Sequence, residues 1–119
     1  MATPNIVSVA TINAFCVNGA VTTSNQDVVD VAAEYVYKIN TIIIANIDGT
    51  NAATVTVSIS TDNGSNYHAI ASTVSVPADA TLVVIDSPIY LMEGDILKGG
   101  ASAASDLDLF VSFEIIDDA

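Results

Sequence analysis

Residues 107–116 read Leu-Asp-Leu-Phe-Val-Ser-Phe-Glu-Ile-Ile. Every second residue from Leu107 to Ile115 is apolar, and Asp108, Ser112 and Glu114 stand at alternate positions. A period of two is that of a β-strand, whose successive side chains point to opposite faces. We therefore expect a strand with one buried face and one wetter face, as in an antiparallel sandwich.

Residues 53–60 alternate in the same way. The pattern directs four apolar residues inward, namely Ala53, Val55, Val57 and Ile59. It directs the polar residues outward, namely Thr54, Thr56, Ser58 and Ser60. This predicts a second half-buried strand.

Residues 36–47 differ, because they are apolar on both faces of the expected strand. One face would carry Tyr37, Ile39, Ile43 and Ile47, and the other would carry Val36, Ile42 and Ile44. Such a strand is either central and covered on both faces or lies at a subunit interface. Under the second interpretation, the candidate residues for contact with other copies or a capsid are Val36, Ile42 and Ile44.

Short strand patterns separated by turn residues fill the rest of the chain. The other strand candidates are residues 5–13, 15–22, 27–33, 67–76, 80–86, 88–91 and 95–98. The turn candidates are Asn18-Gly19, Asp48-Gly49, Asp62-Asn63-Gly64, Pro77-Ala78-Asp79, Ser87-Pro88, Glu93-Gly94-Asp95 and Gly99-Gly100. This spacing predicts one all-β domain over residues 1–119, an antiparallel β-sandwich or jelly-roll-like fold of about eight strands.

Composition leaves two interpretations of the apolar surface open. Hydrophobic residues make up 51% of the 119 residues, and charged residues make up 13%. That charged share is about half of the roughly 25% usual for soluble domains. Either the chain is unusually well buried as a monomer, or neighbouring subunits cover part of its apolar surface, and the second interpretation is a first indication of an oligomer.

The charge of the chain argues against several classes of partner. There are 14 acidic residues against Lys38 and Lys98, a formal net charge of −12. Nucleic-acid binding needs a basic surface, and anionic membranes repel an acidic one. The apolar runs are too short to span a bilayer, and the N-terminus does not read as a secretory signal. We expect a chain made in a reducing cytoplasm, with Cys16, beside Phe15 and Val17, as a buried and inert thiol.

The residues available for catalysis are few. The chain has one His, one Cys and no Arg, and His68 lacks a nucleophile and an orienting carboxylate in its local pattern. We interpret it as a solvent-facing or interface residue. The acidic pairs are Asp106/Asp108, Glu93/Asp95 and Asp117/Asp118, but a glycosidase groove also needs aromatic residues, and the chain has no Trp. The prediction is no enzyme, no catalytic residue and no cofactor.

One loop invites comparison with a calcium site. Residues 62–66, Asp-Asn-Gly-Ser-Asn, are rich in oxygen donors, but the twelfth position of an EF-hand loop begun at Asp62 is Thr73 instead of Glu. A hairpin turn is the favoured interpretation, and a calcium site of another type using Asp106 or Asp108 stays open. No cluster has the spacing of zinc ligands, and Gly99-Gly100 lacks the lysine of a phosphate loop. The sequence predicts no metal site.

Three stretches resemble short virion structural proteins of tailed phages, particularly those of marine and cyanobacterial hosts. They are residues 39–55 with Ala45-Asn46-Ile47-Asp48-Gly49-Thr50-Asn51, residues 75–84 with Ser75-Val76-Pro77-Ala78-Asp79, and Ser87-Pro88-Ile89-Tyr90-Leu91 with Glu93-Gly94-Asp95 and the closing strand Val111-Ser112-Phe113-Glu114. Together they cover roughly residues 38–116, most of the chain. The chain departs from the resemblance at Lys98-Gly99-Gly100-Ala101, where a more regular strand is expected.

The resemblance implies a non-enzymatic β-sandwich at the capsid surface of a virion. More closely, it implies a decoration or cement protein that forms a homotrimer, binds the major capsid protein and is made in the host cytoplasm. The group supplies no catalytic residue to carry over. The alternative is a receptor-binding or fibre-tip module for host glycans, with tyrosines as sugar-stacking residues: Tyr35, Tyr37, Tyr67 and Tyr90. A tail-tube or baseplate component is related to both.

Overall fold

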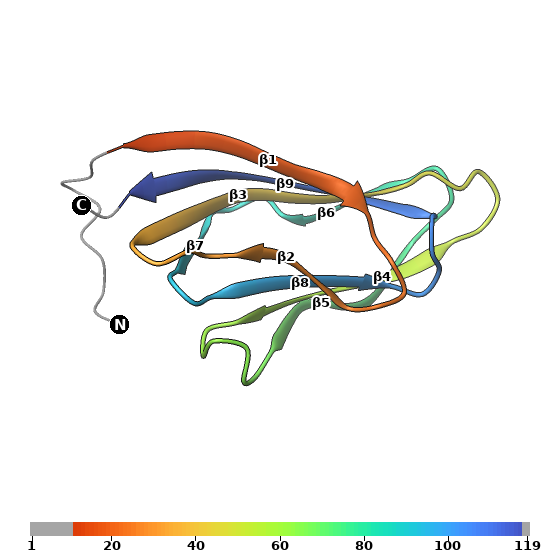
Figure 1. Cartoon of the computed structure of the whole chain (residues 1–119). Coiled ribbons are helices and arrows are strands. Elements are labelled where there is room, and N and C mark those ends of the chain that lie inside the picture. Colours follow the sequence, from red (N-terminus) through yellow and green to blue (C-terminus); the bar gives the residue numbers. More distant parts are fainter. Residues whose placement is uncertain (1–10, 118–119) are drawn as a thin grey trace.

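The computed structural model describes residues 11–117, which form nine β-strands (Figure 1). The strands are β1 (Ile12–Ala20), β2 (Gln26–Asp30), β3 (Tyr35–Asn46), β4 (Ala53–Ser60), β5 (His68–Val76), β6 (Thr81–Ile85), β7 (Ile89–Met92), β8 (Ile96–Ala101) and β9 (Leu107–Asp117). No helix appears in this part of the chain, and therefore none that could cross a membrane. The all-β prediction is confirmed.

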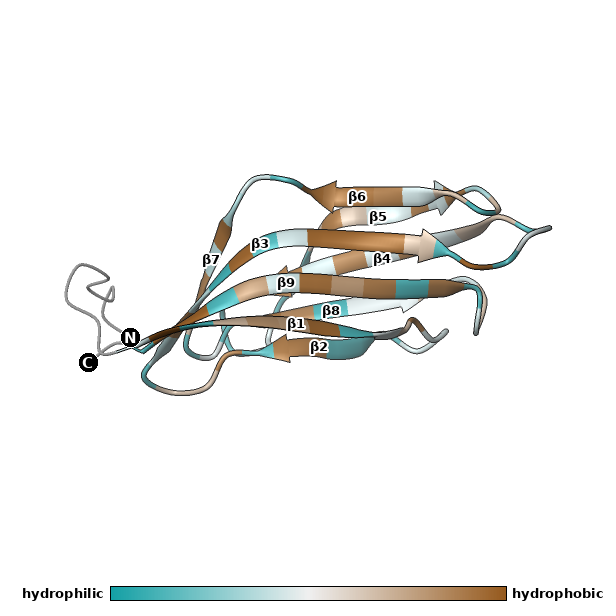
Figure 2. Ribbon diagram, turned by 90° about the horizontal axis from the view of Figure 1, so that it is seen from above, coloured by the Kyte–Doolittle hydropathy of each residue, from teal (hydrophilic) through white to brown (hydrophobic). Residues whose placement is uncertain are grey.

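The strands form two antiparallel sheets that pack face to face. The first sheet has the order β1-β9-β3-β6, with β7 also paired to β3, and the second has the order β2-β8-β4-β5. Without β7 this is the strand order of a jelly roll, in which successive strands pass between two four-stranded sheets except at one hairpin, here that of β4 and β5. Seen from above, β1 lies over β2 on one side of the sandwich and β6 over β5 on the other (Figure 2). The sandwich prediction is confirmed.

The core lies between the sheets and follows the alternation of β9. Leu107, Leu109, Val111 and Phe113 are buried, as the pattern predicts. They meet the inward side chains of β3 and β4, chiefly Ile39, Ile42, Ile44, Val55 and Val57. Burying apolar area at roughly 25 cal/mol per Å² is the main favourable term of such a fold.

A bulge in β3 changes which of its residues share a face. The register of β3 against β9 shifts between Ile39 and Thr41, so that Asn40 is an extra residue. Ile39 and Ile42 therefore both point into the core, and Ile43 points outward beside Phe110. The prediction that placed Ile39 and Ile43 on one face was wrong. β3 is a central strand, with β9 on one side and β6 and β7 on the other.

Two predicted turns lie inside strands instead. Asn18-Gly19 belongs to β1, which pairs with β9 without interruption. Gly99-Gly100 belongs to β8, where a Cβ on the buried Gly99 would stand 3.6 Å from Val28. Within the strand candidate 5–13, residues 5–10 lie outside the described part of the chain.

The last residues of β4 also differ from expectation. Ser58 and Ser60 are buried, although the alternation directs them outward. The loop after β4 folds back over this face, where Ser60 Oγ accepts a hydrogen bond from Gly64 N at 2.8 Å and donates one to Asp62 at 2.8 Å. The loop therefore covers a face that the sequence pattern leaves to solvent.

Candidate functional site

The residues predicted for an interface lie inside a single chain. Val36, Ile42 and Ile44 are 1%, 0% and 0% exposed, and Ile42 and Ile44 belong to the core between the sheets. Packing within one chain accounts for the burial of these two isoleucines. We therefore sought a contact surface among the exposed residues.

The structure does not bring the candidate catalytic residues together. His68 is exposed at the start of β5, whereas Cys16 lies in β1, and these strands form opposite edges of the sandwich (Figure 1). The Cys16 side chain stands opposite Ser112 on the outer face and is exposed, so the prediction of a buried thiol was wrong. Among residues 11–117, no three His, Cys, Asp or Glu residues gather as metal ligands would.

The Asp62 loop is a hydrogen-bonded hairpin connection between β4 and β5. Asn66 donates to the Asp62 carboxylate from its side-chain Nδ2 and its backbone N, each at 2.8 Å, and Ser60 Oγ adds a third bond. These bonds, with those from Asn66 the largest cause, lower the pKa of Asp62 from 3.8 to about 2. Asn63 and Gly64 supply the left-handed backbone that the loop requires.

This loop predicts a pH dependence of stability. Because the carboxyl pKa is lower in the folded chain than in the unfolded one, its contribution is full above 3.8 and is lost as pH falls through about 2. In the Asp62→Asn variant, less stability should be lost over that range. Carboxyl-carbon NMR should give a midpoint near 2 for Asp62, and denaturant unfolding of wild type, Asp62→Asn and the control Asp86→Asn should show the difference. A midpoint near the ordinary value would contradict the hydrogen-bond pattern.

The four tyrosines do not form one sugar-stacking platform. Tyr37 points inward and stacks on Phe113, with ring centroids 5.2 Å apart, and Tyr35 also packs partly against the core. The Tyr67 ring lies under Lys98 Nζ, 4.5 Å away. Tyr90 lies in β7 and is exposed on the outer face of the first sheet, opposite Lys38 of β3. The arrangement therefore offers single exposed aromatics only.

The edge strand β1 is the most accessible part of the sandwich. Eight of its nine residues are exposed, and the side of β1 away from β9 has no partner strand within residues 11–117. Its register against β9 shows no bulge. The first charged residue of the chain is Asp27, so β1 and everything before it are uncharged. Such a strand is a ready template for pairing with another chain.

The other edge strands carry the protection that β1 lacks. β2 has Asp27 and Asp30 and a register shift, and Asp27 pairs with Lys98 at 3.9 Å. β5 has two register shifts against β4. β6 is only five residues long and is shifted against β3, and β7, which pairs with β3 alone, is only four residues long. Bulges, charges and short length are the usual means of preventing edge-to-edge association. By this criterion β1 is the exposed edge fitted for contact.

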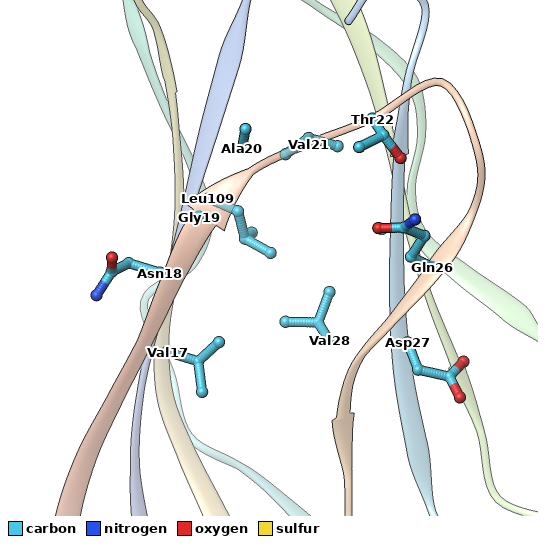
Figure 3. Close-up of a pocket in the computed structure, with 11 residues that line it drawn as sticks. Val17, Asn18, Gly19, Ala20, Val21, Thr22, Gln26, Asp27, Val28 and Leu109 are labelled. Atoms are coloured by element: carbon cyan, nitrogen blue, oxygen red, sulfur yellow. The ribbon is translucent and has the colours of Figure 1, made fainter. Parts of the chain in front are cut away.

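A groove, here called the seam groove, runs between β1 and β2. It is lined by apolar side chains of both strands and by Asp27 and Asp30 of β2. Two adjoining hollows of about 160 and 240 Å³ share Val17 and Val28 in their walls. Figure 3 shows the first of them, with Val17 of β1 and Val28 of β2 among its lining residues. Leu109 lines one of them, and Phe15 and Phe113 line the other. Phe15 points inward beside Phe113, with ring centroids 5.6 Å apart, yet it is 53% exposed. An inward aromatic ring left half uncovered marks a place where apolar surface is available for burial.

A second apolar surface crosses the outer face of the first sheet. Phe110 of β9, Ile43 of β3 and Val83 of β6 are neighbours in register, and we call them the outer row. Phe110 is 41% exposed and Val83 is 52% exposed. The outer row and the seam groove are thus separate surfaces: the outer row lies on the outer face of the first sheet, and the seam groove lies between the edges of the two sheets.

Part of this site could be found from the sequence. The absence of charge before Asp27 is visible there, and it signals an unprotected segment. The position of β1 at an edge, with Phe15 facing a groove, depends on the topology and is not visible in the alternation.

The comparisons with known proteins bear on the fold. No protein-family model matches the sequence, and no curated protein sequence matches it. The structure of a Bacillus endospore appendage, described as one of a novel family of disulfide-linked pili, aligns over 100% of this chain and 98% of its own, with 11% identity and a TM-score of 0.56. At that identity the likeness is one of fold.

Two structures of a pentameric capsid protein isolated from metagenomic phage sequences align more loosely. Each is 13% identical and covers 86% of this chain, with TM-scores of 0.41 and 0.39. The alignments span 60% and 64% of those chains, so this chain matches less than two thirds of their length.

Proposed function

We propose that this chain is a non-enzymatic structural subunit of a virion, a capsid decoration protein that self-associates and binds the major capsid protein. The observation that carries the proposal is the uncharged, exposed and unbulged edge of β1, with the half-exposed Phe15 beside it. The sequence resemblance over residues 38–116 suggests the virion as its setting. We take residues 1–119 as one domain and the trimer as the expected oligomer.

The chain offers two surfaces for the two contacts that a decoration protein makes. The β1 edge and the seam groove would join copies to one another, and the outer row would lie on the capsid shell. Many copies on one shell turn modest contacts into firm attachment. The acidic surface beyond Asp27 suits a position away from the packaged nucleic acid.

Two variants separate these contacts. Phe110→Glu should reduce binding to heads lacking the protein by about tenfold or more, because it charges the outer row, while leaving self-association unchanged. Phe15→Glu should weaken self-association first. Light scattering at micromolar concentration measures the oligomer, expected at three chain masses, and co-sedimentation measures head binding. A chain that stays monomeric and does not bind heads overturns the proposal.

An appendage or fibre subunit is the second candidate. The match to the endospore appendage over the whole of both chains favours it. An assembly of that kind would use the same β1 edge, so the position and copy number of the chain in purified particles distinguish the two.

A further inference from the structure

The seam groove requires an occupant of particular shape and chemistry. Its hollows are smaller than the roughly 300 Å³ at which small-molecule pockets begin. They lie side by side along β1, from Phe15 to Val21, a length of roughly 20 Å at the rise of a strand. A row of small hollows with valine and phenylalanine side chains in their walls, along a free strand edge, fits the side chains of an added strand, because these alternate toward and away from the core.

The free edges beside the groove decide where that strand would pair. β2 is interrupted by a register shift and carries Asp27 and Asp30. β1 is continuous and uncharged over nine residues. An added strand can therefore form an unbroken ladder of backbone hydrogen bonds with β1 but not with β2.

A segment with the matching properties precedes β1 in the same chain. Residues 5–10 read Asn-Ile-Val-Ser-Val-Ala, with no charge and three β-branched apolar residues. Six residues of strand also span roughly 20 Å. Pro4 stands just before them and suits the end of a strand, because it lacks an amide hydrogen.

Charge favours this segment as the contact between copies. Two copies each carry a net charge of −12, so most approaches between them are repulsive. All charged residues lie at or beyond Asp27. An approach of the uncharged N-terminal segment to the uncharged β1 edge avoids close contact between like charges.

A segment entering its own groove would have to reverse direction immediately before β1. Tight reversals between strands use Gly, Asn or Asp at positions of positive φ. The residues before Ile12 are Val9, Ala10 and Thr11, which offer none of these. The segment of a second copy meets no such constraint.

We propose that residues 5–10 of one copy lie in the seam groove of a second copy as an added strand paired with β1. This inference rests on the proposed function, since it names the contact through which the subunits join. Apolar side chains of the donated strand then cover Phe15 and Val17. Each copy both donates and accepts, so the contact is head-to-tail, and it closes a ring such as a trimer if the rotation permits.

Disulfide trapping in the full chain tests the proposal, because Cys16 is the only native thiol. Residues 6–10 are replaced one at a time by cysteine, and the purified assembly is mildly oxidised. We expect links between chains only at outward positions of the added strand, since Cys16 points to the outer face, and mainly at the one residue that lies opposite Cys16. The links should vanish when Cys16→Ser is added.

Other cross-linking patterns overturn the proposal. Links within one chain would mean that the segment folds back. Wild-type dimers linked through Cys16 alone would mean that two β1 strands pair with each other. Equal linking at all five positions, or none in an assembled sample, would mean that no strand is added there.

A matched pair of charge variants gives a second measurement. Phe15→Glu should weaken self-association by about tenfold or more, because it places a carboxylate in the groove. Ile47→Glu is the control, because Ile47 is similarly exposed, at 58%, and lies after β3 away from the groove. Circular dichroism and thermal unfolding verify that both variants fold. Equal self-association of the two variants would overturn the proposal.

The outcomes separate the two proposals. A chain that assembles normally but fails both tests contradicts the donated strand and leaves the structural role standing. A wild-type chain that stays monomeric contradicts both.

Discussion

Ile42→Ala should lower the free energy of unfolding by about 2–5 kcal/mol, the range for truncating a fully buried aliphatic side chain. Ile42 is 0% exposed and lies beside Val111 of the neighbouring strand β9, on the core side of the same sheet. Its neighbour Ile43 points outward and is only partly buried. Ile43→Ala should therefore cost clearly less, about 1 kcal/mol. Denaturant unfolding followed by circular dichroism compares the two variants.

This pair of variants tests the bulge at Asn40. Without the bulge, strict alternation from Ile39 would bury Ile43 and expose Ile42, and the two costs would be reversed. The pair also tests Ile42 as a core residue against Ile42 as an interface residue. A core residue costs the same at low and high protein concentration, whereas an interface residue changes mainly the oligomer equilibrium.

The bounds of β4 and β9 could be predicted from the sequence, because both strands show a regular period of two over residues 53–60 and 107–116. β9 keeps one alternation from Leu107 to Phe113, and β3 loses its alternation at a single extra residue, Asn40. No Gly or Pro marks that position, so nothing local signals the bulge. The only sign of the bulge in the sequence is that residues 36–47 are apolar on both faces of the expected strand.

The misplaced turns show tertiary pairing overriding local preference. Asn18-Gly19 has the composition of a hairpin turn, but nine consecutive pairs with β9 hold it extended. Gly100 lies in β8 beside Asn25, where an added Cβ would stand 3.3 Å from the Asn25 Cα, so a residue without a side chain permits the close approach of the two backbones. Both dipeptides have the composition of turns, but pairing with the neighbouring strands keeps them in an extended conformation.

The candidate site was less predictable than the fold, because exposure at an edge depends on which strand ends the sheet. Phe15 points to the same face as Phe113, and alternation alone would bury both. Phe113 is buried at the centre of the sheet, whereas Phe15 is half exposed at its margin. The difference follows from the strand order: β9 lies between β1 and β3, whereas β1 ends the sheet. The two paired strands are far apart in the sequence, so their order cannot be read from a local pattern.

Asn46→Leu should destabilise the fold by about 2–4 kcal/mol, because it removes three hydrogen bonds at a buried position. Asn46 Nδ2 donates to the carbonyls of Asn51 at 3.0 Å and Val76 at 2.9 Å, and its Oδ1 accepts from Asp48 N at 2.8 Å. Asn46 ends β3 in one sheet and Val76 ends β5 in the other. One side chain, 4% exposed, thus joins both sheets and the loop between β3 and β4.

Asn46→Asp, which preserves size and shape, should make that loss depend on pH. The new carboxylate would face the Asn51 and Val76 carbonyls and be almost fully buried, and both effects raise its pKa above the ordinary value of about 3.9. A carboxyl with a raised folded pKa binds its proton more tightly in the folded chain. Stability relative to wild type should therefore be best below about pH 4 and fall as the pH rises to neutral. The free energy of unfolding of Asn46→Asp, measured below about pH 4 and at neutral pH, tests this expectation. The variant Asn63→Asp, at an exposed position, serves as the control and is measured under the same two conditions. An equal loss at both would show that the Nδ2 bonds do not hold the sheets together.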